Sequence, residues 1–218
     1  MKTLRPLLLA LLSLAVPFWL ILTAIRLLFT PAFLNVEYRL PGFPADPYGF
    51  TLQDRLHYGS LSMEYLVNDS DLTFLEEITL ADGAPLYNAR ELSHMLDVKI
   101  LVQQAFTVGW VLTGMLLGVG VWAWRARRLA GYGRALSRGG IWTLGLVGAI
   151  LLAVALSFDA LFTLFHRLFF TGDTWLFLYS DSLIRLFPIR FWQDAFIAMG
   201  LFTVLGALLL AFFARKLR

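Results

Sequence analysis

The chain of 218 residues contains no cysteine, and this absence removes several kinds of chemistry. Disulfides, thiolate metal sites and a cysteine nucleophile are all excluded. Charged side chains are also scarce, at 15% of the residues where soluble domains carry roughly 25%. Hydrophobic residues make up 59% of the sequence. The composition therefore indicates a protein that lies in lipid.

Signature motifs of several enzyme classes are missing as well. There is no Gly-Lys-Ser/Thr loop, no dinucleotide fingerprint and no HExxH. The long apolar segments are nearly free of polar residues at their centres, which argues against a pore or a carrier. A zinc site would need carboxylate help, because only two histidines are well placed. We therefore expect no metal and no cofactor.

Four apolar segments are long enough to cross a bilayer, which takes about 20 residues. They lie at about 6–29, 101–124, 140–165 and 192–214. The first is longer than the apolar core of a signal peptide and is not followed by a cleavage site, so we interpret it as a retained anchor. These segments predict an all-α integral membrane protein with four transmembrane helices.

Basic residues are concentrated in a few stretches of the chain. The loop at 125–139 carries five arginines and no acid, whereas the segment 31–99 carries 11 acids and only 4 bases. Basic residues also flank the first and last apolar segments: Lys2, Arg5, Arg215, Lys216 and Arg218. The positive-inside rule places this loop and both termini in the cytoplasm. The net charge of +3 then reflects topology and lipid headgroup contact rather than nucleic-acid binding.

The segment after the first span is too long and too patterned for a plain loop. Thr51 with Asp54 predicts an N-cap pair that opens a short amphipathic helix. Two short apolar runs, 78–80 and 85–87, flank Asp82-Gly83 and predict a hairpin with a type I′ turn.

Asn88 followed by Glu91 predicts the cap of a helix that runs on into the second span. The chain is therefore predicted to have a first transmembrane helix at 1–30 and a small extracytoplasmic α+β cap at 31–93. Helices two to four follow at 94–218, with the arginine loop and an outer interfacial segment at 166–191.

Two of the three histidines, His94 and His166, are predicted to lie at a similar depth. His94 lies 31 residues before Arg125, and His166 lies 26 residues after Gly140. A rise of 1.5 Å per residue puts them about 46 and 39 Å from the cytoplasmic edge. A bilayer with headgroups is about 40–45 Å thick, so both fall at the outer interface, where glycerolipid esters lie. His57 stands alone in the predicted cap, and we expect no role for it.

Charged residues near each histidine are candidates to orient its ring. Glu91, His94 and Asp97 recur at i, i+3 and i+6, roughly on one helix face. Asp159 shares the face of His166 and is expected to point into the bundle. The alternative is an interfacial aromatic belt with ordinary anchoring charges, which the spacing alone does not distinguish. The supporting set is Tyr87, Glu91, Asp97, Lys99, Asp159, Asp173, Trp175, Asp181 and Arg185.

Two stretches carry a family resemblance: PLYNARELSHMLDVK at 85–99, and FHRLFFTGDTWLFLYSDSLIRLFPIRFW at 165–192. Together with the four-span layout, they resemble the lipoprotein intramolecular transacylase family of bacterial membrane proteins. By these motifs the catalytic histidines of the family correspond to His94 and His166.

The resemblance implies an acyltransferase at the outer leaflet of the bacterial cytoplasmic membrane. Its substrates would be diacylated lipoproteins. The sn-2 acyl chain would move from the glycerol ester to the α-amino group of the N-terminal cysteine, giving the lyso form. Membrane lipid is the other expected partner. Nucleic acid is not a partner, and we expect a monomer.

The residues suit such a reaction. An α-amino group has a pKa of about 7.7–8.0, so a weak base is sufficient to deprotonate it. One histidine would remove the amine proton, and the other would donate to the oxyanion or to the departing glycerol oxygen. Residue patterns do not assign these two roles. Glu91, Asp97, Asp159 and Asp181 are predicted to orient the rings, and Arg185 to bind a carbonyl or headgroup oxygen.

Two other hypotheses stay open at this point. One is a different membrane lipid acyltransferase or hydrolase that uses the same histidines, with water or another molecule as the acceptor. The other is a non-catalytic membrane protein whose outer domain binds a partner. It predicts that replacing both histidines leaves the function intact.

Overall fold

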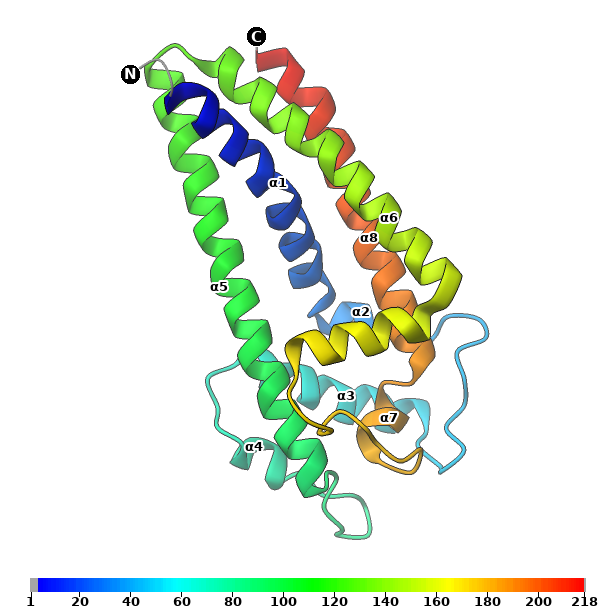
Figure 1. Cartoon of the computed structure of the whole chain (residues 1–218). Helices are drawn as coiled ribbons and strands as arrows, with labels where there is room; N and C mark the ends of the chain where they lie inside the picture. Colours follow the sequence, from blue (N-terminus) through cyan, green and yellow to red (C-terminus); the bar gives the residue numbers. More distant parts are fainter. Residues whose placement is uncertain (1–3, 218) are drawn as a thin grey trace. The chain divides into compact units, whose positions relative to one another are not determined.

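The computed structural model describes residues 4–217, and within them it is built of helices without β-strands (Figure 1). In chain order the elements are α1 (Leu4–Leu28), α2 (Pro31–Glu37), α3 (Leu52–Val67), α4 (Thr73–Glu76), α5 (Ala89–Arg125), α6 (Leu129–Phe169), α7 (Ser182–Leu186), α8 (Ile189–Phe213) and the 3₁₀ helix η1 (Ala214–Leu217).

Four of these elements are long and apolar enough to cross a membrane. They cover Pro6–Leu28, Ala89–Arg125, Leu129–Phe169 and Ile189–Leu217. The prediction of four spans is confirmed, and the protein is a multi-pass membrane protein. The helices α5 and α6 contain 37 and 41 residues, whereas crossing a bilayer requires about 20. They therefore extend outside the segments that hydropathy alone marked.

The chain folds as two compact units. Unit 1 comprises Met1–Leu27, Ala105–Leu156 and Phe196–Arg218, and unit 2 comprises Leu28–Gln104 and Ser157–Ala195. The helices α5, α6 and α8 each contribute one part to unit 1 and another to unit 2. All the residues predicted for the site belong to unit 2.

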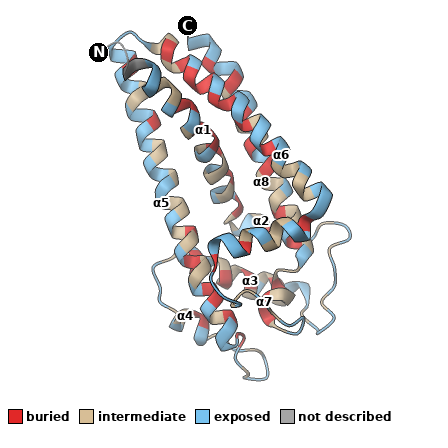
Figure 2. Ribbon diagram, viewed as in Figure 1, coloured by how far each residue is buried: buried red, intermediate tan, exposed pale blue. Residues whose placement is uncertain are grey.

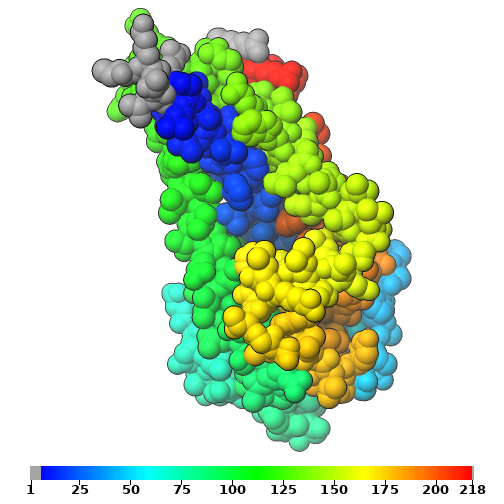
Figure 3. Space-filling model, viewed as in Figure 1, coloured from blue at the N-terminus to red at the C-terminus, as the bar shows by residue number. Residues whose placement is uncertain are grey.

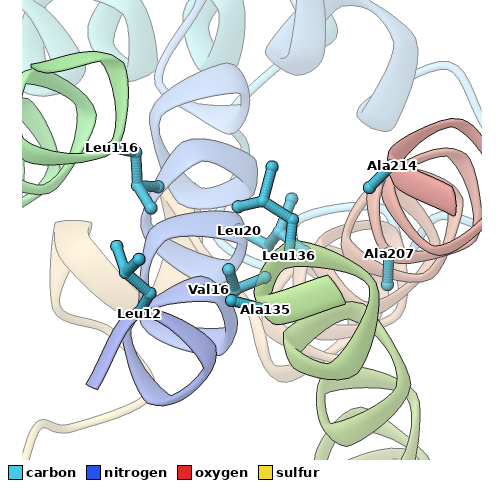
Figure 4. Packing of buried hydrophobic residues seen from close by; sticks show 8 residues of the cluster. All are labelled: Leu12, Val16, Leu20, Leu116, Ala135, Leu136, Ala207 and Ala214. Carbon is cyan, nitrogen blue, oxygen red and sulfur yellow. The ribbon is translucent and has the colours of Figure 1, made fainter. Parts of the chain in front are cut away.

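Unit 1 is held together by an apolar seam between its helices. Figure 4 shows the side chains of this seam: Leu12, Val16, Leu20, Leu116, Ala135, Leu136, Ala207 and Ala214. Polar side chains add a few links between helices, since the indole of Trp19 donates to the Thr113 hydroxyl at 2.9 Å and the Ser13 hydroxyl donates to the Ala135 carbonyl at 3.0 Å.

Two adjacent glycines of α6 allow its close approach to α1 and α8. A Cβ on Gly139 would lie 2.6 Å from the Cβ of Val16, and a Cβ on Gly140 would lie 2.8 Å from the backbone oxygen of Ala207. Both distances are too short for real contacts. Small residues at helix contacts let backbones approach closely, which is how helices pack in lipid.

The outward faces of the unit 1 helices are apolar. On α5, the side chains of Trp110, Val111 and Leu117 are 65–70% exposed, and pale blue predominates along this part of α5 in Figure 2. Exposed apolar area on this scale marks an interaction surface in a water-soluble protein. For a helix of this length the matching environment is lipid hydrocarbon.

Unit 2 has a core of its own, made of residues from four helices and their connections. It contains Tyr65, Leu66, Leu75, Leu86, Tyr87, Met95, Leu183 and Leu186. The helix α3 begins as the sequence predicts, because the Thr51 side chain accepts from the Asp54 amide and the Asp54 carboxylate accepts from the Thr51 amide. This reciprocal pair satisfies two donors that would otherwise lack partners.

The prediction of an α+β cap is wrong. The expected hairpin forms only an isolated bridge between Thr79 and Pro85. Of the two turn residues only Gly83 has a positive φ (82°), whereas a type I′ turn requires it at both. The reason is that two-stranded hairpins are marginal alone, and the described residues provide no third strand.

The assumption of one continuous third helix is also wrong. Ser157 has φ −163° and ψ 90°, which interrupts the helical geometry of α6. The element therefore consists of two helical pieces, 129–156 and 158–169. A constant rise from Gly140 to His166 does not apply, and the predicted depth of His166 loses its basis.

Candidate active site

His94 lies in the first turns of α5, where a cap fixes the helix start. The Asn88 amide donates to Glu91 Oε2 at 2.8 Å, and the Glu91 amide donates to Asn88 Oδ1 at 3.1 Å. The predicted cap is confirmed as a reciprocal pair. It holds the backbone one turn before His94.

The second oxygen of Glu91 connects this turn to α7. The Leu183 amide donates to Glu91 Oε1 at 2.6 Å, and the Glu91 side chain is fully buried. Both carboxylate oxygens are therefore used on backbone amides. The prediction that Glu91 orients a histidine ring is wrong, because it instead joins the start of α5 to the start of α7.

His166 lies near the end of α6 and is hydrogen-bonded through one ring nitrogen. Its Nδ1 lies 2.8 Å from the Phe162 carbonyl oxygen. A carbonyl only accepts, so Nδ1 carries the proton in the neutral ring and Nε2 carries the lone pair. The lone pair is the functional end of a histidine base.

The two imidazoles stack on one another. Their centroids are 6.0 Å apart with an interplanar angle of 20°. His94 is 6% exposed and His166 is 8% exposed. Nδ1 of His94 is buried and has no hydrogen-bond partner within residues 4–217. A buried polar atom without a partner is uncommon, which makes this nitrogen available to a ligand.

Aromatic side chains enclose the histidine pair. Phe170 lies 4.9 Å from His94 and 5.4 Å from His166, and Phe177 lies 5.3 Å from His94, all between ring centroids. Trp175 lies 5.0 Å from His166. These rings shield the imidazoles from water, which strengthens any electrostatic interaction formed there. In Figure 3 the yellow and orange surface of the residues around 157–185 adjoins the green start of α5.

Polar contacts fix the aromatic segment that follows α6. Asn88 Nδ2 donates to Asp181 Oδ1 at 3.2 Å, and the Leu178 amide donates to Asp181 Oδ2 at 2.8 Å. The Arg90 guanidinium donates to the Leu176 carbonyl at 3.1 Å. Asp181 thus holds the segment that carries Trp175 and Phe177, rather than a histidine ring.

The remaining predicted carboxylates have no recorded contact with either imidazole within residues 4–217. Asp159 and Asp173 are exposed, and Asp97 is half-buried. The expectation that Asp159 points into the bundle is therefore wrong. The break at Ser157, two residues earlier, sets the orientation of this turn independently of the preceding helix. Within the described part of the chain, the recorded contacts of the imidazoles are with aromatic rings and one backbone carbonyl.

Arg185 pairs with Asp46, which the sequence analysis did not identify. Its Nε and Nη2 lie 3.1 and 3.0 Å from Asp46 Oδ2, and its guanidinium lies 3.6 Å from the Phe50 ring centroid. Burial alone would raise the pKa of Asp46, but hydrogen bonds from Arg185 and the Phe50 amide lower it below its usual value. Arg185 thus anchors the 46–50 loop to α7.

Lys99 and Tyr87 also have partners away from the histidines. The Lys99 ammonium lies 4.0 Å from the Tyr65 ring centroid and donates to the Ser70 carbonyl. The Tyr87 hydroxyl lies 2.5 Å from the Ser62 hydroxyl, and burial raises the pKa of Tyr87. These contacts hold the fold of unit 2 around the site.

The sequence analysis also missed three residues close to the pair. Phe170 and Phe177 were considered only as part of the aromatic-rich stretch 165–192, and Phe162 lies before that stretch. Their spacing offers one usable signal, since positions 162, 166 and 170 lie one turn apart on a helix. Phe177 has no such periodicity, because it lies in an irregular segment.

The fold and the site together define a multi-pass membrane protein built around a buried histidine pair. The chain belongs to the family of the lipoprotein intramolecular transacylase Lit, whose family model matches residues 10–192. This is an acyltransferase family.

One relative in sequence and two solved structures are similar to this chain. An uncharacterised protein of Aquifex aeolicus (strain VF5) is 28% identical over 192 residues, which cover 86% of this chain and 83% of the relative. The solved structure of the membrane integral lipoprotein intramolecular transacylase Lit from Bacillus cereus has a TM-score of 0.83 at 21% identity, covering 100% of this chain and 97% of that chain. A variant of that protein, with one histidine replaced by alanine, has a TM-score of 0.77 at 21% identity and covers 99% of this chain and 94% of that chain.

Proposed function

We propose that this chain is a lipoprotein intramolecular transacylase. The substrate is a lipoprotein whose N-terminal cysteine carries a diacylglyceryl thioether. The enzyme moves the sn-2 acyl chain to the cysteine α-amino group and leaves a lyso-form lipoprotein. The observation that carries the proposal is the buried histidine pair, 6.0 Å between centroids, in a chain of this family.

The reaction exchanges an ester for an amide within one molecule. The amine nitrogen attacks the ester carbonyl, the bond from that carbonyl to the glycerol oxygen breaks, and the amine proton ends on the glycerol hydroxyl. Atoms and charges balance without a cofactor or an added nucleophile. Holding amine and ester together can lower the barrier by about 7–11 kcal/mol in favourable cases, so proton transfer and oxyanion stabilisation are the tasks left to side chains.

His166 is the better candidate for the base. The protonated Nδ1 donates a hydrogen bond to the Phe162 carbonyl, which leaves the lone pair on Nε2 to accept the proton of the amine. The same hydrogen bond fixes the ring orientation, as a carboxylate does in other histidine sites. As the tetrahedral intermediate collapses and the carbonyl re-forms, protonated His166 can give its proton to the departing glycerol oxygen.

His94 then acts as the hydrogen-bond donor to the oxyanion. Its Nδ1 is buried and lacks a partner in the described chain. An N–H at this position would be satisfied by the carbonyl oxygen as negative charge develops there. Donors that are already in place at that moment are worth more than the same donors in water.

The proposed placement is the outer leaflet of the bacterial cytoplasmic membrane, with both termini and the loop 125–139 in the cytoplasm. The distribution of basic residues supports this orientation. In this arrangement the predicted domain boundaries at 31–93 and 94–218 separate the outer cap from the last three spans. The working form is proposed to be a monomer.

The test is mass spectrometry of lipoprotein N-terminal peptides from a bacterium that leaves its lipoproteins diacylated. Expression of the chain should move one acyl chain to the α-amine at unchanged total mass. His94→Ala and His166→Ala should each abolish the transfer. His57→Ala is the matched control, because His57 is an exposed histidine of the same unit and should retain full transfer.

Other outcomes would decide between functions. Loss of one acyl chain from the peptide, with a matching fall in mass, would indicate a hydrolase. Unchanged peptides with wild-type protein confirmed in the membrane would contradict the proposed activity. Transfer at the wild-type level by both histidine variants would show that the pair has no part in the mechanism.

A further inference from the structure

A cavity lies at the end of unit 1 where α5 is connected to α6. It has a volume of about 600 Å³ and is lined by Trp124, Arg125, Arg127, Leu129, Ala130 and Leu217. All six residues belong to unit 1. The lining combines two guanidinium groups with an indole and aliphatic side chains, and the proposed acyl transfer uses none of them.

The cavity is strongly cationic because unit 1 contains no aspartate or glutamate. Among residues 4–217 the two ion pairs, Arg185 with Asp46 and Arg190 with Asp194, both lie in unit 2. No aspartate or glutamate of unit 1 is therefore available to neutralise Arg125 and Arg127.

Three other cations of unit 1 have partners within the chain, whereas Arg134 and Arg138, like the cavity arginines, have none recorded within residues 4–217. Arg215 Nε donates to the Ser137 hydroxyl at 3.3 Å, Arg128 lies 5.6 Å from the Trp122 ring centroid, and Lys216 lies 4.7 Å from that of Phe212. In the described residues, the side chains of Arg125 and Arg127 have no recorded partner of this kind, and both are exposed.

The backbone at Arg127 adds an independent observation. Its φ is 53°, and it is the one non-glycine residue with a positive φ in the described chain. This conformation is uncommon for residues other than glycine, asparagine and aspartate. Arginine at such a position points to a use for its side chain, because a glycine would fit the turn better.

We propose that this cavity binds the phosphate group of an anionic phospholipid. Guanidinium groups recognise phosphate oxygens in a bidentate geometry. Tryptophan lies at the headgroup level of membranes, and Leu129 and Leu217 offer apolar contact to the glycerol backbone. Phosphatidylglycerol has this combination of charge and apolar surface. A free phosphate would use the arginines but not the apolar wall.

The test is native mass spectrometry of the delipidated full chain titrated with phosphatidylglycerol or phosphatidylcholine. Phosphatidylglycerol should bind more tightly. The double variant Arg125→Gln with Arg127→Gly should weaken its binding at least about 10-fold, the loss expected when hydrogen bonds between a guanidinium and a phosphate are removed. Glycine at position 127 fits the positive φ, so the melting temperature should not fall. Should the double variant fail to fold, Arg125→Gln alone should give the loss.

The matched control is Arg134→Gln with Arg138→Gln, which removes the same charge from exposed positions of unit 1 outside the cavity. Its phosphatidylglycerol affinity should stay within about twofold of wild type. An equal loss in both double variants would overturn the site in favour of diffuse attraction. Inorganic phosphate that raises the melting temperature at constant ionic strength, without selective phosphatidylglycerol binding, would overturn the lipid as ligand.

Discussion

The two units of the chain differ most in their charges. Unit 2 contains all 15 acidic residues, and unit 1 contains none of them but carries 11 of the 18 lysines and arginines. Unit 1 is held by an apolar seam and by glycines at helix contacts. Unit 2 is held by an apolar core together with capping pairs, buried carboxylates and two ion pairs.

This difference shows which interactions stabilise helices in lipid and which interactions fix the polar groups of a catalytic site. In lipid, helices associate through close packing, because burial of apolar surface between them gains little. A site that handles protons requires polar groups in fixed positions, and those are present in unit 2. Substitutions of the histidine pair in unit 2 should therefore alter catalysis most, whereas substitutions at the helix contacts of unit 1 should alter stability.

The largest expected effect is on catalysis. His166→Ala should lower acyl transfer by at least about 100-fold, the contribution usual for general acid–base catalysis. The melting temperature should fall as well, because the ring is buried among aromatic side chains and makes a hydrogen bond to the carbonyl of Phe162. Transfer rates and melting curves on the same purified protein would check both parts. Full activity of His166→Ala would contradict the assignment of catalysis to unit 2.

Glu91→Ala should affect both properties. It removes the acceptor for the Asn88 and Leu183 amides, and hydrogen bonds to a charged group are worth about 1.5–3 kcal/mol each. We expect about 3 kcal/mol of destabilisation in detergent melts, together with a lower kcat. Glu91→Gln keeps one acceptor oxygen and should recover part of both. Full activity in Glu91→Ala would show that the connection to α7 is not needed.

Gly140→Ala should destabilise unit 1 by about 1–3 kcal/mol, the usual cost of overpacking. The new Cβ would lie 2.8 Å from the Ala207 backbone oxygen. Gly145→Ala is the matched control, since nothing lies within 4 Å of its added Cβ, and alanine favours helix there. Equal melting temperatures for the two variants would contradict the proposed role of close helix contact.

The last effect should appear only over part of the pH range, as a pH dependence of stability. Burial, together with Asp194, raises the pKa of Glu37 to about 7, and the residue is 2% exposed. The folded state therefore favours protonated Glu37, and this contribution is lost as the pH rises from about 4.3 through about 7.

Glu37→Gln should accordingly be more stable than wild type at high pH and similar at low pH. The upper limit of the difference is about 4 kcal/mol. Melting temperatures of both proteins measured between about pH 4 and pH 9 would check it. A difference that grows toward low pH would contradict the assignment.

The sequence was sufficient for some features of the fold because they are local. Apolar run lengths predict the four spans, and Asn88 with Glu91 predicts the start of α5. The break at Ser157 was not predictable, since no proline or glycine marks it. The expected strands at 78–80 and 85–87 failed because their pairing depends on neighbours that the local pattern does not contain.

The site was predicted in its chemistry but not in its contacts. The motifs identified His94 and His166, and helix spacing placed Glu91 near them. Spacing could not show that Glu91 uses both oxygens on backbone amides, or that Arg185 pairs with Asp46 139 residues away along the chain. Such partners are set by tertiary packing, which a single sequence does not encode in readable form.

The most direct test of the central claim is a reaction of the purified chain with a synthetic diacylated lipopeptide whose sn-2 acyl chain carries an isotope label. The account predicts that the label appears as an amide on the cysteine α-amine of the same peptide, with unchanged mass. In a mixture with a second unlabelled peptide, no label should cross over. Release of labelled fatty acid, or transfer of label to the second peptide, would contradict an intramolecular transacylase.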